Sequence, residues 1–286
     1  MISGGAAQPI LRHGGEFETK PNLYFKWFAE NYEPILKELN GKGFDIFDFH
    51  WYGKADGDYK KIKPIYEGIK EILKKYNFNE VEIWVTEAGS YSGAPARSGP
   101  LGSFPFQSEK EQAADYFKRF VFSLSMGIKK LFPAFGLIEG FVNDDGYFDH
   151  TGLIYDGRGS DDLGWGVKKL SYYTYKKMTE VLEGSDWEST ETVQEKDDIY
   201  IYKFNKSGKP IWVAWNDQKE PKTVRLTMNK NIKGIKIIEV LPKYEFGRDV
   251  ANYHTAFNEV NWKWVEKNQR NIEFVLRDVP VLLFEK

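Results

Sequence analysis

The chain has 286 residues, of which 41% are hydrophobic, 29% charged and 16% aromatic, and its formal net charge is −2. This composition is typical of a globular protein, and so small a charge provides no field that would draw nucleic acid or an anionic membrane to it. The sequence contains no run of about 18 apolar residues, so no transmembrane helix is expected. The lack of cysteine excludes disulfides, thiolate metal sites and a cysteine nucleophile. The first residues do not resemble a signal peptide, and the compartment is not determined.

Up to about residue 185, short apolar runs alternate with amphipathic helical patterns, which is typical of a parallel α/β fold. Four strand–helix units can be recognised, near 1–40, 43–76, 80–127 and 129–184. A complete eight-unit barrel usually takes about 250 residues. The pattern therefore predicts a partial, half-size β/α barrel of the TIM type.

Within this region several elements have clear sequence signatures. The nearly continuous apolar runs at 43–52 and 129–141 predict strands covered on both faces. A β-branched run at 80–89 ends at Gly89, and Ser108 with Glu111 forms a capping-box pair that opens a helix. In the first unit, we expect helical sequence at about 22–40 to be broken by Pro34.

The pattern changes near residue 186, where long helical periods give way to alternation. Short alternating segments separated by turn signals indicate an antiparallel β-sandwich of about 100 residues. We therefore predict two domains, a half β/α barrel at 1–185 and a β-sandwich at 186–286. The segments are 198–205, 209–217, 222–228, 232–240, 271–278 and 279–286.

Glu87 is the strongest candidate for chemistry. It stands at the C-terminal end of the predicted strand 80–89, and α/β barrels place their active sites at that face. The alternative is a solvated loop acid or a helix cap. Two residues at the end of the preceding strand, His50 and Tyr52, point to one side because they are two positions apart. Both can donate to a carboxylate and hold it ionised, although a core histidine and a rim tyrosine are the plainer alternatives.

Four segments carry a resemblance to a known group of enzymes. They are Ser-Gly-Gly-Ala-Ala at 3–7, Asp-Phe-His-Trp-Tyr-Gly at 48–53, Trp-Val-Thr-Glu-Ala-Gly at 84–89 and Gly-Leu-Ile-Glu-Gly-Phe at 136–141. In this order they are similar to the ends of the fifth to eighth strands of clan A glycoside hydrolases, particularly xylosidase-like and cellulase-like members. The antiparallel region resembles the accessory domain that these enzymes often carry. The resemblance implies that Glu87 is the nucleophile of a retaining mechanism, supported by His50 and Tyr52.

The sequence also departs from that group, whose members carry an acid/base Glu, usually after Asn, at the end of the fourth strand. Asn79 and Glu80 match this pair, but they open a strand at its opposite end. Retaining hydrolysis needs two carboxyl groups about 5–5.5 Å apart. Glu16 and Glu139 are conceivable substitutes, although for Glu139 we favour binding of substrate or capping of a neighbour. The sequence therefore offers a nucleophile, Glu87, but no residue that matches the acid/base of the catalytic pair.

The remaining candidates are aromatic or acidic. Trp51 and Trp84 could contact a sugar, together with Tyr91, Phe104 and Phe106, although some of these must be core. The acidic turns at 56–58 and 143–146 lack the ligand series of a calcium loop, and the histidines have no metal-ligand spacing. We therefore expect neither a metal nor a cofactor.

A half barrel has a physical consequence for partners. It leaves unpaired strand edges and an apolar face, which favour association. We expect either a piece of a longer protein, or self-association or pairing with a complementary N-terminal half-barrel. The leading functional interpretation is a glycoside hydrolase-like protein that acts on an oligosaccharide or glycoside. The alternatives are a non-catalytic carbohydrate-binding module and an inactive fragment; neither nucleic acid nor a membrane is an expected partner.

Overall fold

A computed structural model describes residues 2–6, 26, 28–96, 104–134, 137–140, 145–218, 220–228, 234–263 and 271–286. Its N-terminal part contains a four-stranded sheet in the order β1-β2-β3-β4, in which every neighbouring pair is parallel. These strands are β1 (Ile2–Ala6), β2 (Ile46–Tyr52), β3 (Glu82–Gly89) and β4 (Lys130–Pro133). The predicted parallel sheet is thus confirmed.

In the described part of the chain, this sheet is accompanied by α2 (Glu33–Leu39), α3 (Ile62–Lys75), α4 (Glu109–Ser125) and α5 (Leu170–Leu182). The start of α4 confirms the predicted capping box, because Ser108 accepts a bond from the Glu111 backbone while the Glu111 side chain bonds back to Ser108. Helical residues 28–31 precede α2 and the helix is interrupted at Tyr32, so the helical stretch is broken just before Pro34, as expected. Pro34 stands in the first turn of α2, where its missing N–H would have no partner in any case.

The C-terminal part is antiparallel. A six-stranded sheet has the order β10-β9-β12-β7-β6-β5, and β11 pairs with β8 in a separate ribbon. The strands β5 (Asp186–Lys196) and β10 (Phe257–Lys263) were not predicted; β5 has few apolar residues and lies at a sheet edge, so it shows no alternation. The others are β6 (Ile199–Lys206), β7 (Lys209–Asn216), β8 (Lys222–Thr227), β9 (Gly234–Pro242), β11 (Asn271–Leu276) and β12 (Val281–Glu285).

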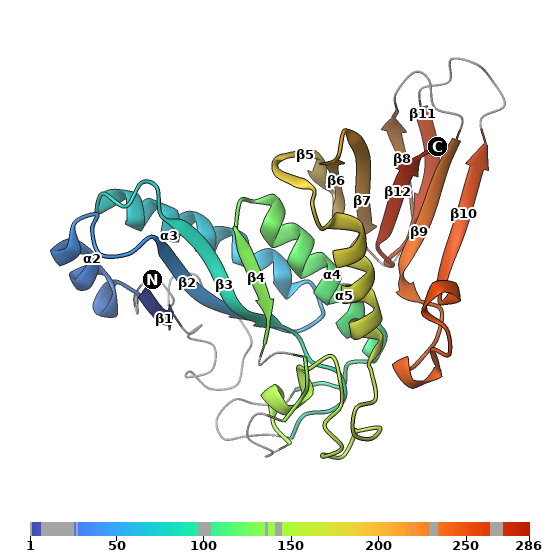
Figure 1. Ribbon diagram of the computed structural model, residues 1–286, viewed down its shortest axis with the longest axis horizontal. Helices are drawn as coiled ribbons and strands as arrows, with labels where there is room; N and C mark the ends of the chain where they lie inside the picture. The colour runs from blue at the N-terminus through green and yellow to red at the C-terminus, as the bar shows by residue number, and fades with distance from the viewer. Residues whose placement is uncertain are drawn as a thin grey trace.

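The two faces of the six-stranded sheet bury different layers, as strand β6 illustrates. Tyr200 and Tyr202 belong to a core cluster shared with the helices, whereas Ile199 and Ile201 belong to a second cluster shared with β8 and β11. This division follows from the period of two in a strand. Helices α4 and α5 therefore lie between the parallel sheet and the antiparallel strands (Figure 1).

A polar cluster joins the two parts of the chain just after β7. The Tyr59 hydroxyl donates to Asp217 Oδ2 at 2.6 Å and accepts a bond from the Trp215 indole at 2.7 Å. Lys118 on α4 donates to Asp217 Oδ1 at 2.9 Å. The segment between β2 and α3, which begins directly after Tyr52, is in this way braced against the antiparallel sheet.

Among the described helices, none is long and apolar enough to cross a membrane.

Candidate active site

The site forms where strand β3 departs from regular pairing with β2. Phe49 is opposite Val85, but His50 is opposite Glu87, so β3 carries one extra residue. A bulge of this kind redirects side chains and is frequent near active sites. Its effect is visible in the contacts: Thr86 donates to Asp48 Oδ2 at 2.6 Å, while Glu87 contacts His50 and Tyr52. Two consecutive side chains of β3 thus meet alternate side chains of β2.

Glu87 is held by the two residues that the sequence pattern indicated. The Tyr52 hydroxyl donates to Glu87 Oε2 at 2.5 Å, and His50 Nδ1 lies 3.1 Å from the same oxygen. Within the described part of the chain, Glu87 Oε1 has no hydrogen bond or ion pair. The Glu87 side chain is 28% exposed and that of His50 is 22% exposed, so a ligand can reach the carboxylate.

The electrostatics of this contact favour an ionised Glu87. Partial burial raises the pKa of the Glu87 carboxyl, but the hydrogen bonds from His50 and Tyr52 outweigh it and leave the pKa below its ordinary value. Burial, followed by the bond to Glu87, raises the pKa of Tyr52 far above its usual range. Tyr52 is therefore a neutral donor and Glu87 an anion at neutral pH.

An aromatic cluster stands behind Tyr52. Its buried members are Tyr52, Tyr91, Phe104 and Tyr147, together with Ala134. Tyr147 packs edge-on against Tyr52, with ring centroids 6.0 Å apart and an interplanar angle of 89°. Tyr91 and Phe104, which were considered for a sugar-binding cleft, are 0% and 5% exposed and form part of this cluster, whereas Phe106 is 66% exposed.

The two tryptophan candidates lie in different environments. Trp51 alternates with His50 and Tyr52, so it faces the other side of the sheet and is fully buried in the core shared with the helices. This position corrects the expectation that Trp51 contacts a sugar, because no surface of its ring is open. Trp84 is partly exposed; its indole donates to Glu82 Oε2 at 2.9 Å and its ring lies 6.1 Å from that of Phe132.

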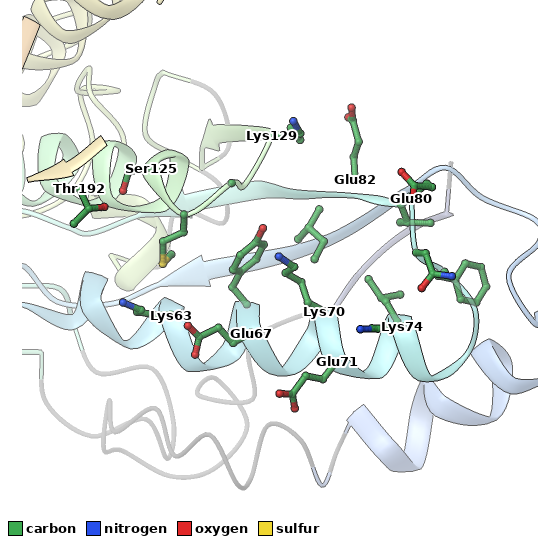
Figure 2. A pocket seen from close by; sticks show the side chains of 18 of the residues that line it. Lys63, Glu67, Lys70, Glu71, Lys74, Glu80, Glu82, Ser125, Lys129 and Thr192 are labelled. Carbon is green, nitrogen blue, oxygen red and sulfur yellow. The ribbon is translucent and has the colours of Figure 1, made fainter. Parts of the chain in front are cut away.

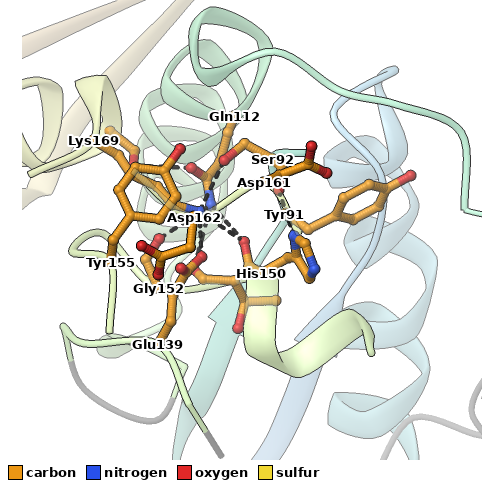
Figure 3. A network of polar contacts seen from close by, with 12 residues as sticks. Tyr91, Ser92, Gln112, Glu139, His150, Gly152, Tyr155, Asp161, Asp162 and Lys169 are labelled. Carbon is orange, nitrogen blue, oxygen red and sulfur yellow. Dashed lines mark hydrogen bonds and ion pairs between the residues drawn. The ribbon is translucent and has the colours of Figure 1, made fainter. Parts of the chain in front are cut away.

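Glu139 lies in a buried polar network (Figure 3). Its carboxylate accepts a bond from Lys169, whose ammonium also donates to Ser92 Oγ at 2.9 Å and to the His150 carbonyl at 3.2 Å. The side chains of Lys169 and Glu139 are only 0% and 3% exposed. Burial raises the pKa of Glu139 to about 7, although Lys169 opposes that rise. This environment indicates a structural ion pair and not contact with substrate.

Several other expectations concern acidic residues. Glu16, Asn143 and Asp144 lie outside the described residues. Glu80 is exposed near the start of β3, at the end opposite Glu87. There it lines a groove of about 1050 Å³ whose rim alternates lysine and glutamate side chains from α3 (Figure 2). No group of three His, Cys, Asp or Glu side chains in the described ranges could hold a metal ion.

Two residues of the site escaped sequence reasoning. Asp48, 8% exposed, accepts the Thr86 hydroxyl; the polar positions 48, 50 and 52 within an apolar run were a signal for it. Tyr147 follows β4 in a loop, at the start of the short 3₁₀ turn Tyr147–His150. Nothing in its local sequence connects it with strands that lie far earlier in the chain.

A scan against protein-family models finds no match, and neither does a search of curated protein sequences. Solved structures do match. A family 39 glycoside hydrolase from the gut symbiont Bacteroides cellulosilyticus WH2 has a TM-score of 0.57 and 16% identity, over 94% of this chain and 48% of that one. An α-L-arabinofuranosidase from Thermotoga maritima, in an arabinose complex, has a TM-score of 0.57 and 11% identity, over 93% and 61% of the two chains.

A third similar structure is a β-porphyranase of glycoside hydrolase family 86 from the human gut bacterium Bacteroides plebeius. Its TM-score is 0.54 and its identity 14%, over 98% of this chain and 46% of that one. This chain spans about half the length of the structures it matches. Because the identities are so low, the likeness shows the fold alone. The chain has a glycoside hydrolase-like fold, and the structures that share it are clan A glycoside hydrolases.

Proposed function

We propose that this chain carries the nucleophile half of a retaining glycoside hydrolase site, with Glu87 as the nucleophile. The observation that supports this most directly is the convergence of the Tyr52 hydroxyl and His50 Nδ1 on Glu87 Oε2. A nucleophilic carboxylate must be ionised, oriented and accessible. Glu87 meets these requirements at the C-terminal end of a parallel strand, where barrel enzymes carry their sites.

The proposed reaction has two steps. The Glu87 carboxylate attacks the anomeric carbon, the bond to the leaving-group oxygen breaks, and a glycosyl ester forms. Water then hydrolyses the ester and regenerates the carboxylate. An acid must protonate an ordinary leaving group in the first step, and as a base it must activate water in the second. His50 and Tyr52 hold Glu87 ionised, and the partly exposed Trp84 and the exposed Phe106 are candidates to contact the sugar.

The acid/base residue is the second part of the proposal. In the described residues no other carboxyl group contacts Glu87, and Glu139 is held by Lys169. We propose that residues 1–185 form half of a β/α barrel, that 186–286 form its β-sandwich accessory domain, and that a complementary N-terminal half-barrel supplies the acid/base. Two observations support this arrangement. The chain spans about half of the similar structures, and β1 and β4 stand at the ends of the parallel sheet.

Self-association is the other way to cover these edges. Light scattering distinguishes self-association from pairing with an N-terminal half-barrel. A stable dimer of this chain alone favours self-association. A monomer that binds a separately produced N-terminal half-barrel favours pairing with that half. A monomer that binds no such half and no hydrophobic dye would contradict both.

The nucleophile is tested with 2-fluoro glycosides that carry a dinitrophenolate leaving group. Because this leaving group departs with its electron pair and needs no proton, the first step can proceed without the acid/base residue. A panel that includes xylose and arabinose derivatives should add the mass of one fluorosugar, located at Glu87 by peptide mapping. Glu87→Gln should not be labelled. A protein that binds the panel by calorimetry but is never labelled would be a carbohydrate-binding module, and one that neither binds nor reacts an inactive fragment.

A further inference from the structure

We propose that Tyr147 is a positioning residue that holds Tyr52 and Glu87 in register. Its hydroxyl bonds the backbone at the ends of both strands that carry them. The effect on catalysis rests on the function proposed above, but the positioning itself can be measured without turnover.

The hydrogen bonds of Tyr147 converge where β2 and β3 end. Its hydroxyl lies 2.9 Å from the Gly53 carbonyl and 3.2 Å from the Gly89 carbonyl, and it accepts a bond from the Gly53 N–H at 3.2 Å. Gly53 directly follows Tyr52, and Gly89 is two residues beyond Glu87. A phenol has one hydrogen, which the two carbonyls share, and lone pairs that accept the Gly53 N–H, so this single group contacts both strand ends.

A backbone hydrogen bond joins the two strand ends directly. Gly53 N–H also donates to the Gly89 carbonyl at 3.2 Å. A Cβ at Gly53 would lie 2.8 Å from the Asp58 Cβ, and one at Gly89 would lie 2.7 Å from the Tyr116 hydroxyl. A side chain at either position would therefore push against a neighbouring side chain, so glycine suits both strand ends.

The need for such a tie follows from the bulge. Regular pairing is interrupted between Phe49 and His50, and only a few pairs follow it, the last of them Tyr52 with Gly89. Glu87 and Tyr52 both lie in this short segment, and their side chains meet at 2.5 Å. A small slip between the strands would lengthen that bond, and Tyr147 opposes the slip at the last pair. Its ring also packs edge-on against the Tyr52 ring.

Tyr147 can supply this bond at any pH that the fold survives. Its side chain is only 2% exposed, and burial raises the pKa of its hydroxyl well above the ordinary value. It therefore acts as a neutral hydrogen-bond donor, and Tyr147→Phe removes the donor while the ring stays in the aromatic cluster.

The experiment follows the Glu87 carboxyl by ¹³C NMR in protein labelled at the glutamate carboxyl carbons. The Glu87 signal is identified by its loss in Glu87→Gln. Tyr52→Phe should raise the pKa of Glu87, because it removes a bond that stabilises the anion. Tyr147→Phe should raise that pKa by a smaller amount, because the Tyr52 bond is kept but lengthened.

Tyr91→Phe is the matched control. Tyr91 belongs to the same aromatic cluster and donates its hydroxyl to a backbone carbonyl, that of Pro105, at 2.8 Å, away from the strand ends. It should lose comparable stability in urea and leave the pKa of Glu87 unchanged. An unchanged pKa in Tyr147→Phe, or an equal rise in Tyr91→Phe, would overturn the positioning role. A rise confined to Tyr147→Phe in a protein that fluoroglycosides never label would uphold positioning and reject the hydrolase proposal.

Discussion

Tyr52 and Glu87 are 35 residues apart in sequence, yet the hydroxyl of one lies 2.5 Å from the carboxylate of the other. The contact arises because parallel strands β2 and β3 bring their C-terminal ends to one edge of the sheet. It makes Glu87 an oriented anion in a partly exposed position.

Loss of the Tyr52 hydroxyl should slow labelling of Glu87 and shift its pH dependence. In the native protein the pKa of Glu87 is lowered, so the reactive anion persists as the pH falls below the ordinary range for glutamate. Tyr52→Phe should move the acidic limb of the labelling rate to higher pH. We also expect the maximal rate to fall by up to about 100-fold, the order found when a reacting group is displaced by about 1 Å.

The measurement is the rate of mass increase with a dinitrophenyl fluoroglycoside between pH 3 and pH 8. Phe106→Leu, at an exposed position, is a suitable comparison because it alters a candidate sugar contact without touching Glu87. Phe106→Leu should change how the labelling rate depends on fluoroglycoside concentration and leave the acidic limb of the pH–rate profile in place. If the acidic limb of the pH–rate profile lay at the same pH in Tyr52→Phe as in the unaltered protein, the hydrogen bond from Tyr52 to Glu87 would have no electrostatic role.

Asp217 should be a major source of stability at the junction of the two parts of the chain. Its side chain is 9% exposed and that of its partner Lys118 is 11% exposed. Asp217→Asn leaves the Lys118 ammonium without its counter-charge, and breaking a buried pair costs about 3–5 kcal/mol. Urea unfolding at pH 7 measures the loss. Asp198→Asn is the control, because Asp198 is 49% exposed and such a surface pair contributes about 1 kcal/mol or less.

The contribution of Asp217 to the free energy of unfolding should decrease at acidic pH. Burial raises the pKa of Asp217, but Lys118 and Tyr59 outweigh it and leave the pKa below the ordinary value of 3.8. A group with a lowered folded pKa stabilises the fold above its unfolded pKa and loses that effect as the pH falls through the folded value. The stability gap between the native protein and Asp217→Asn should therefore narrow below about pH 4. A gap that is constant down to pH 2 would contradict the assignment.

The sequence predicted the parts of this molecule that depend on local patterns. The apolar runs located β2, β3 and β4, and the Ser108–Glu111 pair located the start of α4. The place of Glu87 beside His50 and Tyr52 also followed, because strand ends in a parallel sheet share one edge. Strand β5 was missed because it is polar and lies at an edge.

Other features depend on tertiary packing that no local pattern encodes. Trp51 and Tyr52 are adjacent aromatic residues that point to opposite faces of the sheet. Which face is covered by the helices decides that Trp51 lies in the core and that Tyr52 contacts Glu87. The extra residue in β3 is a property of the pairing between two strands. The partner of Glu139 is Lys169, at the start of a helix 30 residues later, and the strand-end motif of Glu139 suggested substrate instead.

The buried pair of Glu139 and Lys169 should make stability depend on pH in the neutral range. Burial raises the pKa of Glu139 from 4.5 to about 7, so between these values the folded protein binds more protons than the unfolded chain. Stability should therefore be highest at the acidic end of this window and fall as the pH rises to about 7. Glu139→Gln should abolish this slope, because the amide does not titrate. The free energy of unfolding, measured in urea at intervals from pH 4.5 to pH 8, tests the prediction.

Lys169→Met gives the complementary result. It leaves a buried carboxylate without its cation, which costs about 3–5 kcal/mol and should steepen the loss of stability with rising pH, because the ionised form is no longer compensated. The double variant Lys169→Met with Glu139→Gln removes both charges and should recover part of the loss. A double variant that is no more stable than Lys169→Met at pH 8 would show that packing of the lysine stem, and not charge, is what the pair contributes.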